Sequence, residues 1–314
     1  MRINTTSENI RLSRKIRAIL SGLIAVLMVF FVSDPGFSKN QIFSPVIQIN
    51  ELESIAKNKL VLLDTRSSWK FLLSHIPGAR RIDHWKDFTT RVNGAPGILI
   101  EDKEFLAGKL SELGIDYSKI IVIYGEAIDK WRTDGRFFWM FKYLGFKNVA
   151  ILEGGVEKWK RNNKPVERGT AGEFSGSELS PDEIKFDRSV HADQTWIHKR
   201  LGSKSIALID TRAKSEYEGE TPYGSSRGGH IPGAIHLDWR DFFTDKGALK
   251  KTAQLKSILN QSGINPEQET VVYCTGGVRS GMSFLVLQYL GYKVRNYDGS
   301  WWDWSLNPSL PAEN

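Results

Sequence analysis

The chain contains one series of short motifs twice, in the same order. The matched pairs are VLLDTR (61–66) and ALIDTR (207–212), HIPGA (75–79 and 230–234), WKDF (85–88) and WRDF (239–242), and YLGFKNVAILEGGVEKW (143–159) and YLGYKVRNYDGSWWDW (289–304). Because the whole series recurs in order, the pattern predicts duplication of a domain. The chain of 314 residues is long enough for two domains.

A polar, glycine-rich stretch separates the two copies. ERGTAGEFSGSELSPDE at 167–183 has few apolar residues and is typical of a linker. We therefore predict a first domain at 39–166, a linker at 167–185 and a second domain at 186–314.

Each copy alternates short apolar runs with helical patterns. KLVLLDT, KIIVIY and NVAILEGG are rich in β-branched residues, as buried parallel strands are. DKEFLAGKLSELG has apolar residues at helical spacing and ends on a glycine. This alternation predicts an α/β fold with two tandem domains, each a parallel sheet with helices on both faces. Ligands of such sheets bind beyond the carboxyl ends of the strands.

Residues 1–38 are interpreted as a targeting segment rather than as part of the folded domains. The apolar run AILSGLIAVLMVFFV (18–32) follows a basic segment that contains Arg11, Arg14, Lys15 and Arg17. The run is shorter than the roughly 20 residues of a membrane-spanning helix, and GFS at 36–38 offers small residues for cleavage. We expect a cleaved signal peptide or an uncleaved membrane anchor. In either case the folded body is exported, to the periplasm or to the outer side of a membrane.

Composition restricts the classes of function. The net charge is +7, but no Lys/Arg-rich run with interleaved aromatics is present, so nucleic acid is not an expected partner. The single cysteine, Cys274, excludes a disulfide within the chain and argues against a cysteine-based metal cluster. The six histidines have no metal-ligand spacing. We expect no metal and no organic cofactor.

Cys274 has an unusual setting. It follows the apolar run TVVY and precedes a helical pattern, and the residues between are Thr275, Gly276, Gly277, Val278 and Arg279. Two glycines allow the backbone to curl so that several N–H groups point inward, and the helix directs its positive end to the same place. Arg279 adds a fixed positive charge. These groups should lower the pKa of the thiol below the value of about 8.5 for free cysteine, whereas a buried structural cysteine would favour apolar neighbours.

With DTR and HIPGA in both halves, YCTGGVRS at 273–280 and DGSWWDW at 298–304, the chain resembles the tandem-domain rhodaneses, the thiosulfate and 3-mercaptopyruvate sulfurtransferase family. The resemblance covers about residues 43–312. It implies that Cys274 takes a sulfane sulfur from a small anionic donor, forms a persulfide and passes the sulfur to cyanide or a thiol. It also implies that residues 275–279 bind the persulfide and its substrate.

Two other functions use a similar architecture. Some protein-tyrosine phosphatases and arsenate reductases have a cysteine, five residues and then an arginine. Here four residues lie between Cys274 and Arg279, and this tighter loop suits a sulfur atom better than a tetrahedral phosphate. The second alternative is a persulfide carrier that serves a membrane-associated partner, reached through residues 18–32.

The first half departs from the family pattern at the position of the nucleophile. Gly125 stands where the second half has Cys274, and the loop YGEAIDKWRTDGRF is three residues longer than its counterpart. Without a nucleophile this half cannot form a covalent intermediate. We expect its loop to cover a site between the domains and to bring Trp131, Arg132 or Arg136 near it.

The sulfur donor is predicted from charge. The family's mammalian-type members carry an arginine six residues after the strand-end aspartate, where this chain has Glu216, and the middle of the cysteine loop is neutral. Both features favour 3-mercaptopyruvate. Arg279, Arg227 in the insert YEGETPYGSSRGG and Arg212 favour thiosulfate, because a guanidinium group suits a sulfonate. We predict thiosulfate, with Arg279 deciding the choice.

Arg212 has a second interpretation. The DTR motif also occurs in the half without a cysteine, which indicates that Asp210 and Arg212 brace the loop by hydrogen bonds. The same reasoning makes His75 and His230 structural turn residues rather than bases.

Overall fold

The computed structural model describes residues 43–174 and 176–314. The predicted signal or anchor segment at 1–38, with its apolar run at 18–32, lies outside the described residues. In the part of the chain that the structure describes, no helix has both the length and the apolar character needed to cross a membrane.

The first half is built on a parallel sheet with the strand order β1-β7-β6-β2-β3. Its strands are β1 (Val46–Ile47), β2 (Leu60–Asp64), β3 (Arg80–Arg81), β6 (Ile120–Tyr124) and β7 (Val149–Leu152). Side chains of one face pack on α2 (Ile49–Ser54), α3 (Ser68–Leu73) and α6 (Gly155–Arg161). The other face packs on α4 (Lys103–Glu112) and α5 (Thr133–Tyr143).

The second half repeats this plan with a parallel sheet of order β11-β10-β8-β9. Its strands are β8 (Ile206–Asp210), β9 (Ile235–His236), β10 (Glu269–Tyr273) and β11 (Val294–Asn296). One face packs on α7 (Gln194–His198) and α11 (Ser300–Leu306), and the other on α9 (Thr252–Gln261) and α10 (Arg279–Tyr289). The short helix α8 (Lys214–Tyr217) follows β8. The predicted fold class, parallel sheets with helices on both faces, is confirmed.

The strands alternate between the two cores of their sheet, as side chains with a period of two must. In β6, Ile121 and Ile123 enter the core that contains α5, while Val122 enters the core on the opposite face. In β10, Val272 and Val271 divide in the same way. Both faces of each sheet are therefore buried, which explains why these strands are apolar throughout rather than alternating.

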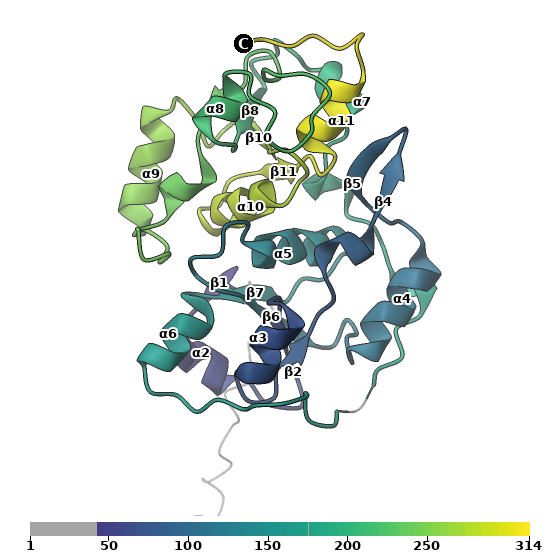
Figure 1. Cartoon of the computed structure of the whole chain (residues 1–314), viewed down its shortest axis with the longest axis vertical. Helices are drawn as coiled ribbons and strands as arrows, with labels where there is room; N and C mark the ends of the chain where they lie inside the picture. The colour runs from purple at the N-terminus through teal and green to yellow at the C-terminus, as the bar shows by residue number, and fades with distance from the viewer. Residues whose placement is uncertain (1–42, 175) are drawn as a thin grey trace, which may run out of the picture. The chain divides into compact units, whose positions relative to one another are not determined.

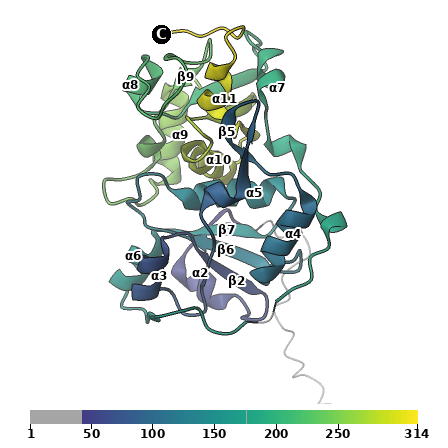
Figure 2. The same ribbon diagram turned by 45° about the vertical axis from the view of Figure 1, so that its right-hand side comes forward.

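The two halves share one hydrophobic core. Helices α5 and α10 lie side by side between the sheets (Figures 1 and 2), and their buried residues belong to a single cluster with residues from both sheets. The first turns of these helices touch through glycine. A Cβ at Gly135 would lie 2.5 Å from the Cα of Met282, and one at Gly281 would lie 2.8 Å from the Cα of Arg136. The repeat-equivalent positions thus contact each other reciprocally, and residues 43–314 form one compact unit.

Smaller elements join the halves further. The hairpin of β4 (Thr89–Val92) and β5 (Ala95–Leu99) projects from the first half toward α11 (Figure 1). Leu99 at its end donates its N–H to the Asp298 carboxylate of the second half, over 2.9 Å. Among the described residues the remaining elements are the 3₁₀ helices η1 (Trp85–Phe88), η2 (Pro181–Glu183), η3 (Arg188–Val190) and η4 (Trp239–Phe242).

The HIPGA turns are held in the same way in both halves. The backbones of His75 and Glu167 exchange two hydrogen bonds of 2.9 Å, and those of His230 and Glu313 exchange bonds of 2.8 and 3.0 Å. Each histidine also places Nδ1 3.0 Å from a backbone carbonyl oxygen. The backbones of Glu167 and Glu313 therefore fix the two turns in the same way. Glu167 begins the predicted linker, and Glu313 lies near the end of the chain. Both histidines are structural residues of these turns.

Candidate active site

The cysteine loop joins β10 to α10 at the carboxyl edge of the second sheet. Cys274 follows the last residue of β10, and α10 begins at Arg279. The start of α11 fixes the backbone of the loop. Ser300 accepts a hydrogen bond from the Cys274 N–H at its Oγ (3.1 Å), and the N–H of Trp301 donates to the Cys274 carbonyl (3.0 Å).

Both glycines of the loop are required by close contacts. A Cβ at Gly276 would lie 2.2 Å from the ring of Trp302, which packs against the loop. Gly277 has a φ of +75°, a conformation that favours glycine, and a Cβ there would lie 2.5 Å from the Arg136 guanidinium. The loop can therefore curl only because these two positions lack side chains.

The loop favours a thiolate at Cys274, which is only 1 % exposed. Burial alone would raise the pKa of the thiol. The Arg279 charge, together with the backbone N–H groups of Ser280 and Gly276, outweighs burial and holds the pKa of Cys274 below its usual range. This combination is the setting of a reactive cysteine, because the thiolate is the nucleophilic form.

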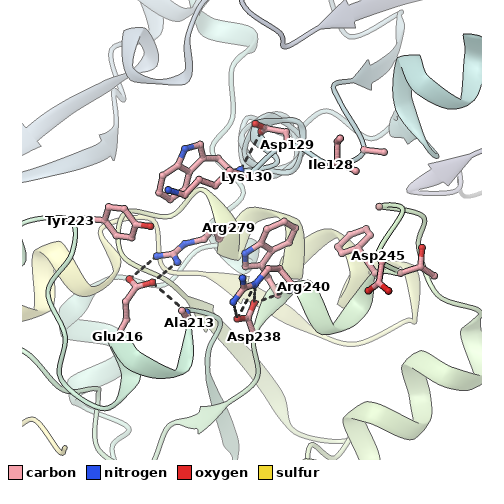
Figure 3. A pocket seen from close by; sticks show the side chains of 16 residues that line it. Ile128, Asp129, Lys130, Ala213, Glu216, Tyr223, Asp238, Arg240, Asp245 and Arg279 are labelled. Carbon is pink, nitrogen blue, oxygen red and sulfur yellow. Dashed lines mark hydrogen bonds and ion pairs between the residues drawn. The ribbon is translucent and has the colours of Figure 1, made fainter.

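Arg279 is held by a buried carboxylate. Its Nη1 and Nη2 donate to the two oxygens of Glu216 over 2.6 and 2.9 Å, and the Thr275 hydroxyl donates to the same carboxylate over 2.6 Å. Burial would raise the pKa of Glu216, but the bonds from Arg279 and Thr275 lower it, so the carboxylate stays charged. Figure 3 shows the Arg279–Glu216 pair in the wall of the cavity described next.

A cavity of about 400 Å³ opens beside this pair, between the two halves. The first half contributes residues 127–131, and the second half contributes Glu216, Arg279, Tyr223 and residues that follow β9. In Figure 3, Asp129 and Lys130 lie on the wall that faces Glu216 and Arg240. The expectation that the first-half loop covers a site between the halves agrees with this placement.

Two ion pairs take up four of the seven charged residues that line the cavity, and the carboxylates of Asp129 and Asp245, which also line it, form no ion pair among the described residues. Arg240 binds Asp238 with Nη2 and Oδ2 2.5 Å apart, and Arg279 binds Glu216. Lys130 lines the same cavity and forms no ion pair with any residue in 43–174 or 176–314. Its Nζ lies 4.9 Å from the ring centre of Trp131 and 5.6 Å from that of Tyr223.

Trp131 and Tyr223 form an aromatic pair that joins the halves. Their ring centres are 5.0 Å apart, with the planes at 69°. The guanidinium of Arg279 lies 5.6 and 5.4 Å from the same two rings. The pair thus has a cation from each half against it, Lys130 and Arg279, a placement that cation–π attraction stabilises.

Arg212 and Arg227, two predicted substrate contacts, are engaged elsewhere. Arg212 is 1 % exposed, and its Nε donates to Asp210 over 2.9 Å while its Nη2 donates to the Gly229 carbonyl over 2.7 Å. Arg227 donates to the carbonyl oxygens of Asn307 and Leu310 over 3.1 and 2.7 Å. Both arginines therefore brace the backbone. For Arg212 this agrees with the structural role that the repeated DTR motif indicated, and not with a direct contact to substrate.

The three residues singled out in the first-half loop have different places. Trp131 lines the cavity. Arg132 pairs with Asp134 over 2.9 Å and does not line it. Arg136 reaches the cysteine loop itself, where its Nη1 lies 3.3 Å from the Gly277 carbonyl oxygen.

Several residues of the site had no signal in the sequence. Lys130 and Tyr223 belong to segments that differ in length between the halves, so the repeat offers no counterpart for either. Ser300 lies in the DGSWWDW motif, but its bond to Cys274 depends on a φ of +53° that the motif does not reveal. Within residues 43–174 and 176–314, no group of three or more histidine, cysteine or acidic side chains is placed to hold a metal ion.

Comparisons with known proteins place this architecture in a family. A sequence model of the rhodanese-like domain matches residues 49–162 and 193–307. A thiosulfate sulfurtransferase of Azotobacter vinelandii is 31% identical over 85% of this chain and 96% of its own length. The sulfur carrier protein TtuD of Thermus thermophilus is 34% identical over 76% of this chain and 84% of its own.

Solved structures agree on the fold. The 3-mercaptopyruvate sulfurtransferase SseA from Escherichia coli superposes with a TM-score of 0.71 at 25% identity, and the alignment covers 82% of this chain and 99% of SseA. The Tum1 protein from Saccharomyces cerevisiae gives a TM-score of 0.74 at 22% identity over 87% of this chain and 99% of its own. The chain therefore belongs to the rhodanese family, as a sulfurtransferase with two tandem rhodanese-like domains.

Proposed function

We propose that the protein transfers a sulfane sulfur from thiosulfate to cyanide or a thiol through a persulfide on Cys274. The observation that carries this proposal is the buried thiol with a lowered pKa, at the head of a loop whose amides and Arg279 stabilise negative charge. No metal or organic cofactor takes part.

The proposed reaction is a double displacement. The Cys274 thiolate attacks the outer sulfur of thiosulfate, the S–S bond breaks, and sulfite leaves with the electron pair. The terminal sulfur of the persulfide is then attacked by cyanide or by a thiolate, and the Cys274 thiolate is restored. The amides and the Arg279 charge that stabilise the thiolate also stabilise the anionic persulfide.

The structure changes the charge argument for the donor. Arg279, which decided the prediction, has its guanidinium bound by Glu216, and Arg212 and Arg227 are engaged elsewhere. Support for thiosulfate now comes from Lys130, the cavity cation without an acidic partner among the described residues, and from the relatives named as thiosulfate sulfurtransferases. We propose that Lys130 binds the sulfonate end of the donor.

A Lys130→Met variant tests this role. Loss of one exposed charge contact should raise KM for thiosulfate a few-fold, equivalent to about 1 kcal/mol or less, and leave kcat nearly unchanged. The difference from the wild type should shrink at high ionic strength, because salt screens the contact. Steady-state kinetics at two salt concentrations provide the measurement.

Lys103→Met is the matched control, since Lys103 is a half-buried lysine with its Nζ 6.0 Å from the ring centre of Phe186 and does not line the cavity. If Lys130→Met and Lys103→Met have the same KM for thiosulfate, Lys130 does not bind the donor. Parallel kinetics with 3-mercaptopyruvate decide the donor class. A tenfold higher kcat/KM for 3-mercaptopyruvate in the wild type would overturn the choice of thiosulfate.

Two observations favour the alternatives. The Glu216 carboxylate in the cavity wall repels a dianion more than a monoanion, which favours 3-mercaptopyruvate. The relative TtuD is named as a sulfur carrier, which favours a role in handing the sulfur to a protein. Slow turnover with small acceptors, combined with a long-lived persulfide, would support the carrier role.

We also propose export of the folded body by residues 1–38. A fusion of residues 1–45 to a reporter should place the reporter outside the cytoplasm, because the basic segment and the apolar run at 18–32 have the order of a signal sequence. The control fusion carries Ile24→Arg and Leu27→Arg, which interrupt the apolar run. Cytoplasmic reporter from both fusions would refute the proposal, and release of a shortened reporter would distinguish cleavage from anchoring.

A further inference from the structure

We propose that Arg136, which belongs to the half without a nucleophile, is a positioning residue for the sulfur-transfer loop of the other half. This role deepens the proposed function, since it concerns the loop that holds the Cys274 thiolate. The duplication does not explain this arginine. The equivalent position in the second half is Met282, and no counterpart of Arg136 enters the first-half loop there.

The location of Arg136 is set by the close contact of α5 and α10. Gly135 and Gly281 bring the first turns of these helices into backbone contact, so the residue after Gly135 starts beside α10. The side chain of Arg136 is 2 % exposed and lies against Trp139, whose ring centre is 4.6 Å from the guanidinium carbon. These contacts direct the side chain toward the cysteine loop, where the guanidinium reaches Gly277.

The guanidinium group bridges two backbone carbonyls. Nη1 donates to Gly277 over 3.3 Å, and Nη2 donates to Gly97 of the β4–β5 hairpin over 2.9 Å. The C=O of one residue and the N–H of the next point in opposite directions across a trans peptide. When Arg136 holds the Gly277 carbonyl, the Val278 N–H therefore points away from Arg136. A loop that stabilises an anion needs its amide N–H groups to point to one side, and this bond helps to keep them there.

The charges around Arg136 support the same role. Its Nη2 lies 3.7 Å from Asp298, but that carboxylate also binds the Leu99 N–H over 2.9 Å and lies 3.1 Å from Nε2 of His191. The Gly299 N–H also donates to Asp298, over 3.0 Å, so this carboxylate is shared among four partners and does not serve Arg136 alone. Burial is the largest cause and holds the pKa of Arg136 below its usual range, while Asp298 and Cys274 act to raise it, so the coupling between Arg136 and Cys274 acts in both directions.

Substitution of Arg136 should change the chemistry of Cys274 and not only the stability of the protein. In Arg136→Gln the guanidinium bridge and the charge are lost. We expect the pKa of Cys274, measured by alkylation with iodoacetamide against pH, to rise. We also expect kcat to fall at least tenfold, about 1.4 kcal/mol, with a smaller change in KM. Alkylation requires no sulfur donor, so this test stands even if the proposed donor or reaction is wrong.

Arg66→Met is the matched control. Arg66 is likewise a buried arginine of the first half and binds a carboxylate, Asp64, over 2.6 Å, but it does not contact the cysteine loop. It should lower stability without moving the alkylation profile. A wild-type profile and wild-type kcat in folded Arg136→Gln would overturn the proposal, as would an equal shift in Arg66→Met.

Arg136→Lys provides a second measurement should Arg136→Gln fail to fold. Lysine keeps the charge but cannot bridge the Gly97 and Gly277 carbonyls with a planar fork. The proposal predicts a clear loss of kcat relative to the wild type, together with a small rise in the pKa of Cys274. Wild-type kcat in Arg136→Lys would show that the carbonyl bridge does not position the loop.

Discussion

Replacement of Cys274 by serine is expected to abolish sulfur transfer, with kcat/KM lower by at least about 10³-fold. The hydroxyl of serine is not ionised near neutral pH, so the covalent step has no nucleophile. The fold should be unaffected, because serine has the shape of cysteine with oxygen in place of sulfur, and the free energy of unfolding should change by about 1 kcal/mol or less. Enzyme assays and a thermal unfolding curve give the two measurements.

The duplication offers a control for this variant. In Gly125→Cys/Cys274→Ser the cysteine is moved to the equivalent position of the first half. A Cβ at Gly125 would lie 2.9 Å from the Thr65 hydroxyl, and the loop that follows lacks the paired glycines, so the double variant should stay inactive. Recovery of activity in the double variant, or near-wild-type activity in Cys274→Ser, would contradict the assignment of the nucleophile.

Removal of the Arg279 guanidinium is expected to have the second largest effect. In Arg279→Met the Glu216 carboxylate, whose side chain is 3 % exposed, is left buried without its cation. Loss of one partner of a buried ion pair costs about 3–5 kcal/mol, so the free energy of unfolding should fall by about that amount. The pKa of Cys274 should rise, since Arg279 is the leading favourable cause of its low value.

The sign of the pH effect follows from the reactive form. The alkylation rate rises as the pH passes the pKa of the thiol, so in the wild type the rise should occur below the value of about 8.5 for free cysteine. In Arg279→Met the profile should move to higher pH. A wild-type profile that rises at or above the free value would show that the loop does not stabilise the thiolate.

Two further variants separate stability from chemistry. Arg279→Met/Glu216→Gln removes the unpaired charge as well, so it should regain much of the lost stability while the pKa of Cys274 stays high. Arg240→Met breaks an ion pair whose arginine side chain is 64 % exposed, and it should cost no more than about 1 kcal/mol. Equal losses of stability in Arg240→Met and Arg279→Met would contradict the burial argument.

The duplication explains why so much of the fold could be predicted. Each strand motif occurs twice, and apolar runs such as IVIY and TVVY have the length and composition of buried parallel strands. The place of Cys274 beyond the carboxyl edge of the sheet followed from the same pattern. Repetition also indicated a bracing role for the DTR motif. Arg66 and Arg212 bind the aspartate two residues earlier in the same geometry.

The parts of the site that could not be predicted are those that the duplication does not repeat. The pairing of Arg279 with Glu216 joins residues 63 positions apart, and only the path of the chain between them brings the two together. A count of arginines along the sequence therefore gives too much free positive charge for binding an anionic donor. Lys130 and Tyr223 depend on how the halves pack. Arg136 was expected near the site, but its bond to the Gly277 carbonyl depends on the contact of Gly135 with α10, which has no periodic signal in the sequence.

The formation of a persulfide on Cys274 is the central claim, and intact-protein mass spectrometry tests it most directly. Wild-type protein treated with thiosulfate, or in parallel with 3-mercaptopyruvate, should gain the mass of one sulfur atom. Peptide mapping should place that atom on Cys274, and cyanide should remove it. Cys274→Ser should gain nothing under the same conditions. Absence of the added sulfur with both donors, or its presence in the Cys274→Ser variant, would contradict the account.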